Sequence, residues 1–93
     1  MRTIEHTTQF RRDYKRERKG PLGQRLEGLL DDVAEMLALD RPLPPRFRDH
    51  PLTGEWRDFR DCHLRPDLVL IYRKAGSTVL QLVRLGSHSE LGL

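Results

Sequence analysis

The chain has 93 residues and, with 17 Lys or Arg against 14 Asp or Glu, a formal net charge of +3 at pH 7. This length predicts a single domain over residues 1–93 with one modest core, so that an active site must be built on its surface. The one cysteine, Cys62, excludes a disulfide framework, and no apolar run approaches the roughly 18 residues of a membrane span. Because the first residues also lack the apolar core of a signal peptide, we expect a soluble cytoplasmic protein whose mild basic bias suits a polyanionic partner.

The first residues predict a short strand followed by a basic helix. Residues 2–7 are partly β-branched, which favours a strand. In residues 9–19, Phe10 and Tyr14 form the only apolar face, at a helical spacing, and basic side chains outnumber acidic ones. This helix is either a solvated surface or a surface that contacts the phosphates of RNA.

A Gly-Pro pair at residues 20–21 separates the basic helix from a second, longer one. Apolar residues recur at steps of three and four over residues 22–37, with acidic residues between them. This pattern is typical of an amphipathic helix that packs on a sheet. Three prolines within residues 42–45 then prevent the helix from continuing.

The C-terminal half predicts a three-stranded antiparallel meander. Residues 56–64, 68–72 and 78–85 are rich in apolar, aromatic and β-branched side chains, and turn signals near Pro66 and Gly76 separate them. The element order β-α-α-β-β-β predicts an α+β fold in which an antiparallel sheet packs on two helices.

The two turns determine which side chains meet at one end of this sheet. A pivot near Pro66 keeps Asp67 beside the end of the preceding strand, and a pivot near Gly76 brings residues 84–88 back past Asp67. Four side chains are therefore expected to converge: His63, Asp67, Arg84 and His88. A guanidinium, a carboxylate and two imidazoles in one cleft suit acid–base chemistry at a phosphate. Topology alone does not place His50.

Each of these side chains also has a structural interpretation. A histidine is often a surface or structural group, Asp67 is suited to capping a turn, and Arg84 is long enough to lie along apolar neighbours with its charge in water. Arg60 and Lys74 are weaker candidates for binding a phosphate. Four other side chains are expected in the core rather than in the chemistry: Trp56, Phe59, Tyr72 and the thiol of Cys62.

Many of these residues recur at a fixed spacing that is similar to that of a known family. The pattern comprises His50-Pro51-Leu52, Gly54, Trp56, Arg60-Asp61, His63, Asp67, Ile71-Tyr72, Arg84, Gly86 and His88. It resembles the YafQ branch of the RelE toxin superfamily, small bacterial endoribonucleases of type II toxin–antitoxin systems. The resemblance implies a microbial RNase-like fold and metal-independent, cofactor-free cleavage of messenger RNA in the A site of the ribosome. It also implies a neutralising antitoxin of the DinJ or RelB type and the ribosome, with its ribosomal RNA, as a partner.

The chemistry that follows from this hypothesis is transesterification of RNA. A base removes the proton of a 2′-hydroxyl, this oxygen attacks the neighbouring phosphorus, and an acid protonates the departing 5′-oxygen. Histidine suits both roles because its unperturbed pKa is roughly 6.5. The resemblance adds His50 to the catalytic candidates and favours His88 as the acid. Asp67 is either the base itself or a carboxylate that orients His63 or His50, and Arg84 would hold the phosphate.

The end of the chain departs from this family pattern. Relatives commonly carry an aromatic residue shortly after the last histidine, whereas this chain ends with Leu91, Gly92 and Leu93. A leucine does not stack on a base as a ring does, so a weakly active homologue is one alternative. A non-enzymatic nucleic-acid-binding module, which would need only the basic helix, is another. A zinc protein with three histidines and one Asp as ligands is a third, although the sequence lacks a short paired ligand motif.

Overall fold

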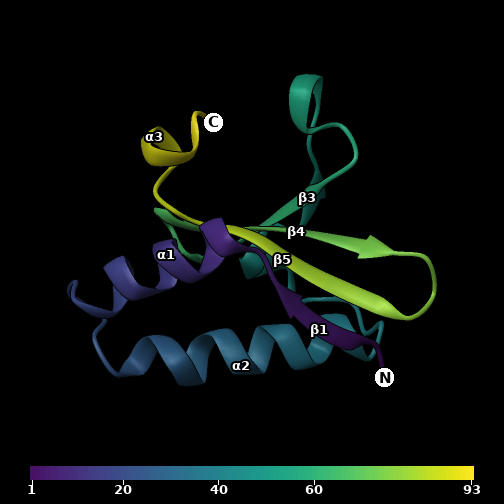
Figure 1. The fold of residues 1–93 in the computed structure, drawn as a ribbon, viewed down its shortest axis with the longest axis horizontal. Helices are drawn as coiled ribbons and strands as arrows, with labels where there is room; N and C mark the ends of the chain where they lie inside the picture. Colours follow the sequence, from purple (N-terminus) through teal and green to yellow (C-terminus); the bar gives the residue numbers. More distant parts are fainter.

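A computed structural model describes all residues from 1 to 93. The chain forms five strands, three α-helices and two short 3-10 helices (Figure 1), in this order: β1 (Thr3–His6), α1 (Thr8–Arg18), α2 (Arg25–Ala38), η1 (Pro45–Phe47), β2 (His50–Pro51), η2 (Gly54–Trp56), β3 (Arg60–Arg65), β4 (Leu68–Ala75), β5 (Val79–Gly86) and α3 (His88–Leu91). None of the helices is both long and apolar enough to cross a membrane.

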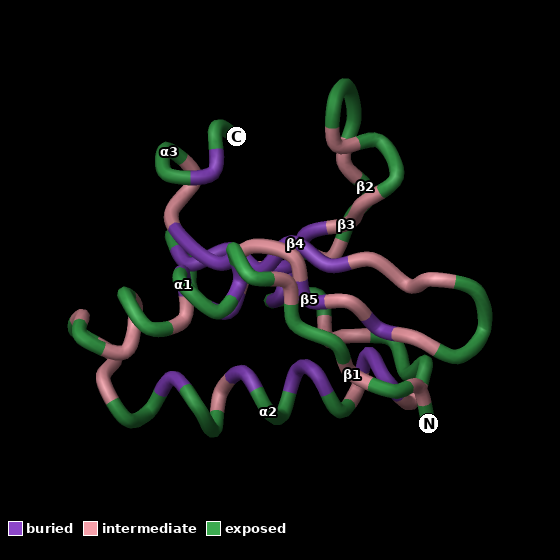
Figure 2. The backbone as a smooth tube through the Cα atoms, in the orientation of Figure 1, coloured by how far each residue is buried: buried purple, intermediate pink, exposed green.

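The two long helices follow the local signals of the sequence. The hydroxyl of Thr7 caps α1 by accepting the N–H of Phe10 at 3.0 Å, and basic side chains in the last turn interact favourably with the helix dipole. In α2 the side that faces the sheet is buried and the outer side is exposed (Figure 2). Its buried side chains are Leu26, Leu30, Val33, Ala34, Leu37 and Ala38. Each larger one contributes about 1.5–3 kcal/mol through burial.

The strand order in the sheet is β1-β5-β4-β3-β2. The predicted meander is confirmed, because β3, β4 and β5 pair antiparallel in sequence, with His63 opposite Val69 and Val69 opposite Gly86. The prediction of an entirely antiparallel sheet is wrong, since β1 lies parallel to the outer edge of β5. The chain returns to β1 only after two helices and three further strands, and nothing in the short segment Thr3–His6 specifies this direction.

The two faces of the sheet differ in how they are covered. Helices α1 and α2 lie under one face, whereas α3 and the β2–β3 region project from the other (Figure 1). The main core of 16 buried residues lies on the helix-covered face. On the opposite face, Val69, Ile71 and Leu91 form a small cluster with partly buried apolar neighbours. The second face is therefore only thinly covered, and it carries the predicted site residues described below.

Three local elements differ from the sequence prediction. The strand expected from residue 56 begins at Arg60, because Gly54 with φ 66° starts a 3-10 helix through Trp56. The segment His50–Pro51 adds a two-residue edge strand beside β3. A third helix follows Ser87, which caps it. The predicted α+β fold class with two helices on a sheet is confirmed.

Candidate active site

The junction between β5 and α3 places His88 at the end of the sheet. The Ser87 hydroxyl accepts the N–H of Glu90 at 3.2 Å, and the Glu90 carboxylate accepts the N–H of Ser87 at 2.8 Å. This reciprocal capping box turns the chain sharply after β5 and starts α3 with His88. The backbone of His88 is therefore fixed by the sequence Ser87-x-x-Glu90.

Asp67, in the turn between β3 and β4, holds the His88 side chain. Its Oδ1 lies 2.8 Å from Nδ1 of His88 and accepts the backbone N–H of the same residue at 3.2 Å. These hydrogen bonds lower the pKa of Asp67, so it is ionised at neutral pH. Because a carboxylate only accepts, the His88 proton lies on Nδ1 and leaves Nε2 free to exchange a proton.

His50 is oriented in the same way by a backbone carbonyl. Its Nδ1 lies 2.7 Å from the carbonyl oxygen of Arg48, which fixes the proton on Nδ1 and leaves Nε2 available. Arg48 has a left-handed backbone conformation with φ 48° and ψ 43°, which a non-glycine residue adopts rarely. The turn at Arg48 thus aims its carbonyl at His50.

Asp61 lies beneath the histidines and is almost fully buried, with 3% of its surface exposed. Its Oδ1 is 3.1 Å from Nδ1 of His50, but this N–H points to the Arg48 carbonyl, so Oδ1 has no hydrogen-bond partner. Burial raises the pKa of Asp61, and the neighbouring histidines His50 and His63 offset part of this effect. A buried carboxylate with an unpartnered oxygen beside imidazoles is more typical of an active site than of a core.

His63 lies between the other two imidazoles. Its ring centroid is 6.3 Å from that of His50 and 5.0 Å from that of His88. Burial lowers the pKa of His63; the adjacent Asp61 raises it, and Arg48 and the other histidines lower it further. His63 is therefore uncharged at neutral pH.

The three imidazoles open into one surface hollow of about 620 Å³. Its wall also includes Arg48, Trp56 and Asp61, and its rim includes the C-terminal Leu93. Trp56 is half-buried, and its ring packs edge-on against that of Phe59, with 5.3 Å between the ring centroids. The hollow thus combines three imidazoles, a buried carboxylate, a guanidinium and an indole.

The structure brings His63, Asp67 and His88 together, as the predicted topology requires, and it adds His50 through the edge strand β2. It does not bring Arg84 to them. The Arg84 guanidinium donates to Asp13 of α1 at 2.7 and 3.3 Å. The Asp13 carboxylate holds this guanidinium, and Arg84 does not line the hollow. The expectation that Arg84 joins the imidazoles is therefore wrong.

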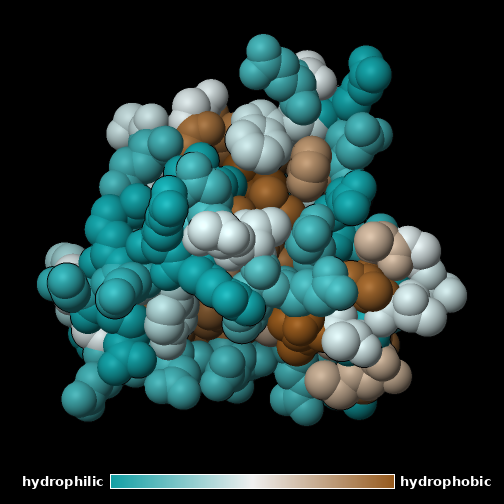
Figure 3. All heavy atoms as spheres, viewed as in Figure 1, coloured by the Kyte–Doolittle hydropathy of each residue, from teal (hydrophilic) through white to brown (hydrophobic).

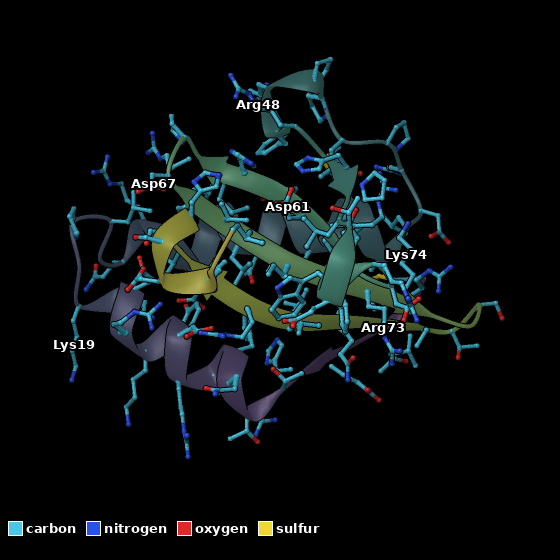
Figure 4. The ribbon with its side chains drawn as sticks, turned by 90° about the horizontal axis from the view of Figure 1, so that it is seen from above. Lys19, Arg48, Asp61, Asp67, Arg73 and Lys74 are labelled. Atoms are coloured by element: carbon cyan, nitrogen blue, oxygen red, sulfur yellow. The ribbon has the colours of Figure 1, made fainter.

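Arg60 and Lys74 also lie outside the hollow. Arg60 pairs with Asp49 at 3.2 Å and with the hydroxyl of Tyr72. Lys74 pairs with Asp40 at 2.8 Å, and Figure 4 shows it at the end of the sheet opposite Asp67. Both cations are held by carboxylates, which leaves Arg48 as the arginine in the wall of the hollow.

Three residues of the hollow were missed as site candidates from the sequence. Asp61 was detectable, because strand periodicity places it on the same face as His63, two residues later. Trp56 was assigned to the core, yet it lines the hollow. Arg48 carries no sequence signal, since its position depends on the left-handed turn after η1. The interpretation of Cys62 as a buried apolar group is confirmed, and burial raises the pKa of its thiol.

A network beneath α3 connects the site to α1. The buried carboxylate of Asp13 accepts from Arg84, from the N–H of Leu85 at 3.0 Å and from Arg16 at 3.0 Å. Arg16 in turn donates to the carbonyl of Leu85 and lies 3.2 Å from Glu90. A Cβ at Gly86 would approach Arg16 Nη2 to 2.9 Å, so a larger residue there would require the Arg16 side chain to shift.

Comparison with known proteins identifies the family. The profile of the bacterial toxins of type II toxin–antitoxin systems, YafQ, matches residues 2–92. The chain belongs to this family. It is 34% identical to the mRNA interferase toxin YafQ of Escherichia coli K12 over 95 aligned positions, covering 98% of this chain and 96% of that protein. An mRNA interferase is an endoribonuclease, the enzyme class predicted from the sequence.

Solved structures of other bacterial toxins have the same fold. The crystal structure of the E. coli DinJ–YafQ complex matches with a TM-score of 0.82 and 35% identity, over 98% of both chains. A copper-bound mutant toxin from Helicobacter pylori matches with a TM-score of 0.89 and 36% identity, over 98% of this chain and 99% of that one. In the present YafQ-family chain, no three His, Cys, Asp or Glu side chains are grouped to hold a metal ion, as the zinc interpretation would require.

Replacing Asp61 by Asn is expected to stabilise the fold at neutral pH, by about 1 kcal/mol. Burial raises the pKa of Asp61 in the folded state. The contribution of Asp61 to the stability of the fold is therefore fully present below the unfolded pKa of about 3.9, and it is lost as the pH rises through the folded pKa. The melting temperature of the variant should therefore exceed that of the wild type near neutrality and approach it in acid. Thermal unfolding across pH checks this, with the exposed Asp58→Asn as the matched control. A variant less stable at neutral pH would contradict it.

Proposed function

We propose that this YafQ-family protein is a metal-independent endoribonuclease that cuts messenger RNA in the A site of the ribosome by transesterification at the 2′-hydroxyl. The observation that carries the proposal is the group of three imidazoles with ring centroids 5.0 and 6.3 Å apart, open to solvent and backed by two carboxylates. The name mRNA interferase of the curated E. coli relative supports the same activity.

His88 is the general acid in this proposal. The Asp67 carboxylate accepts from Nδ1 at 2.8 Å, which keeps Nε2 pointing away from Asp67. In the imidazolium form Nε2 carries the proton that the departing 5′-oxygen needs. Asp67 acts through His88, by holding its tautomer and orientation, as the carboxylate of a catalytic triad does.

His50 is the general base. The Arg48 carbonyl fixes its proton on Nδ1, so Nε2 of the neutral ring has a free lone pair for the 2′-hydroxyl proton. Once His50 has accepted this proton, the buried carboxylate 3.1 Å from Nδ1 stabilises the resulting cation. His63, uncharged and between the two, donates to the phosphate, and Arg48 offsets the growing negative charge on its oxygens.

Trp56 supplies the aromatic surface that the C-terminal residues lack. Its ring lines the same hollow as the imidazoles, whereas Leu91 is buried in the small apolar cluster. An aromatic ring beside the reacting phosphate suits stacking on an unpaired base of single-stranded RNA. The scissile nucleotide would thus be held by stacking on one side and by charge on the other.

The partners in this proposal are an antitoxin and the ribosome. A complex of DinJ with YafQ is known from E. coli, and an acidic or helical antitoxin segment of the DinJ or RelB type would cover the active-site hollow of this chain. The surface over α1 and the outer side of α2 is predominantly hydrophilic (Figure 3). Exposed basic side chains of α1, such as Arg11, Arg12 and Lys15, suit contact with ribosomal RNA phosphates.

The test is cleavage of a defined message on purified ribosomes. We expect the purified protein to cut the message in the A site in the presence of excess chelator, for as long as the ribosomes stay intact. The new ends should carry a 5′-hydroxyl and a 2′,3′-cyclic or 3′-phosphate. Products with a 5′-phosphate, which result from attack by water, would contradict the proposal.

A further inference from the structure

A second hollow lies on the other side of His63. It has a volume of about 450 Å³ and is formed by η1, the end of β3 and the facing side of α2. His63 and Arg48 line both hollows, so the second one adjoins the candidate active site directly. A strand of RNA that passes over His63 therefore meets this hollow next.

The second hollow is lined by three arginines and by no carboxylate. Arg46, Arg48 and Arg65 are exposed, and none has a carboxylate oxygen within 4.0 Å. Arg60 and Arg84, by contrast, are each held by an aspartate. Unpaired guanidiniums around a hollow provide planar, permanently charged donors that match a phosphate in two-pronged hydrogen bonds.

The floor of the second hollow is apolar. Leu29, Phe47 and Leu64 form it, and the Arg46 guanidinium lies over the Phe47 ring at 4.7 Å. This stacking holds the cation at the wall without neutralising it. A charged wall above an apolar floor suits a nucleotide, with the phosphate at the arginines and the sugar or base below.

We propose that Arg46 and Arg65 bind a backbone phosphate of the message next to the scissile one, so that the second hollow is a separate RNA-binding subsite. This inference rests on the proposed endoribonuclease function and adds to it how the strand is aligned over His63. The subsite acts in binding, while the proton transfers stay with His50 and His88.

The test compares Arg46→Ala/Arg65→Ala with a charge-matched control, Arg25→Ala/Arg41→Ala, whose exposed arginines line neither hollow. Cleavage on programmed ribosomes is measured in single turnover as a function of toxin concentration. The subsite variant should need about tenfold more toxin for half-maximal rate. Its rate at saturation and the pH profile of that rate should be unchanged. The slope of log affinity against log salt concentration should be shallower by about 0.7, for the one phosphate contact that is lost.

A second arm identifies the phosphate that is bound. Each linkage on either side of the scissile one is replaced in turn by an uncharged methylphosphonate with a 2′-O-methyl sugar, and compared with a 2′-O-methyl phosphate at the same place. One replacement should raise the toxin concentration for half-maximal rate of the wild type and of the control variant. The subsite variant has already lost this contact, so the same replacement should leave its half-maximal concentration unchanged.

The outcomes separate this inference from the proposed function. No cleavage by the wild type would overturn both. Cleavage with equal half-maximal concentrations for the subsite and control variants would overturn the subsite alone. The subsite would also be overturned if the subsite variant needs more toxin but no methylphosphonate changes the half-maximal concentration of the wild type. The arginines would then contact ribosomal RNA rather than the message.

Discussion

Substituting His88 by Ala is expected to lower the rate of message cleavage about 10²- to 10⁴-fold, the usual contribution of a general acid. Expression of the wild type without antitoxin should arrest growth, and the variant should relieve this arrest. The physical reason is that no other proton donor is held at this place: Asp67 fixes the His88 ring, and His63 lies 5.0 Å away, centroid to centroid, with a lowered pKa.

The role of Asp67 is tested by the isosteric Asp67→Asn. An amide retains a side chain of the same size but offers Nδ1 no ionised acceptor, so the His88 tautomer and charge are no longer fixed. We expect a large loss of rate with an unchanged circular dichroism spectrum and melting cooperativity. The matched control is His6→Ala, because His6 lies on β1 against Phe10 and away from the hollow. Full activity of both His88→Ala and Asp67→Asn would remove these residues from the mechanism.

Substituting Asp13 by Ala is expected to lower the free energy of unfolding by about 3–5 kcal/mol. The Asp13 side chain is 3% exposed and that of Arg84 is 24% exposed, so the substitution leaves a mostly buried guanidinium without its carboxylate. It also removes the acceptor of the Leu85 N–H, which lies in the core. Asp13→Asn should lower the free energy of unfolding by less than Asp13→Ala does, because the amide oxygen still accepts the N–H of Leu85.

Urea unfolding measures the Asp13 effect, with the slope of free energy against urea kept as a check on two-state behaviour. The matched control is Glu17→Ala on the same helix, where a partly exposed ion pair with Arg16 is lost. This control should cost less than about 1 kcal/mol. An Asp13→Ala variant as stable as the Glu17→Ala variant would show that the network beneath α3 contributes little.

The convergence of His63, Asp67 and His88 was predictable because it depends only on the antiparallel order of β3, β4 and β5. Two turn signals fix this order, and the side chains at the ends of neighbouring strands then meet whatever the detailed register. His50 was predictable only from the family resemblance, since its loop and the two-residue strand β2 have no periodic signal of their own.

The assignment of Arg84 failed for a reason that the sequence does not display. The antiparallel order does bring the backbone of Arg84 opposite Ile71, but it does not determine which partner the side chain takes. The carboxylate of Asp13, 71 positions earlier in the chain, holds the Arg84 guanidinium and keeps it out of the hollow. Arg48 shows the converse case, in which a left-handed backbone residue in a loop brings an unpredicted cation into the site.

The direction of β1 and the presence of α3 illustrate the same limit. A strand of four residues at the edge of a sheet pairs wherever the helices that follow it deliver the chain, and its own sequence specifies neither parallel nor antiparallel pairing. The helix α3 has only four residues, too few for an apolar period, although its capping box Ser87-x-x-Glu90 is visible in the sequence.

The central claim, that the 2′-hydroxyl of the message is the nucleophile, is tested most directly by removing that one group. A message with a 2′-deoxy sugar at the scissile nucleotide keeps the backbone charge that dominates binding. We expect the wild-type protein to bind ribosomes carrying this message as it binds the unmodified complex, and to leave the message uncut. Cleavage of the deoxy-substituted message at an unchanged rate would show that another nucleophile is used and would contradict the assignment of His50 as the base.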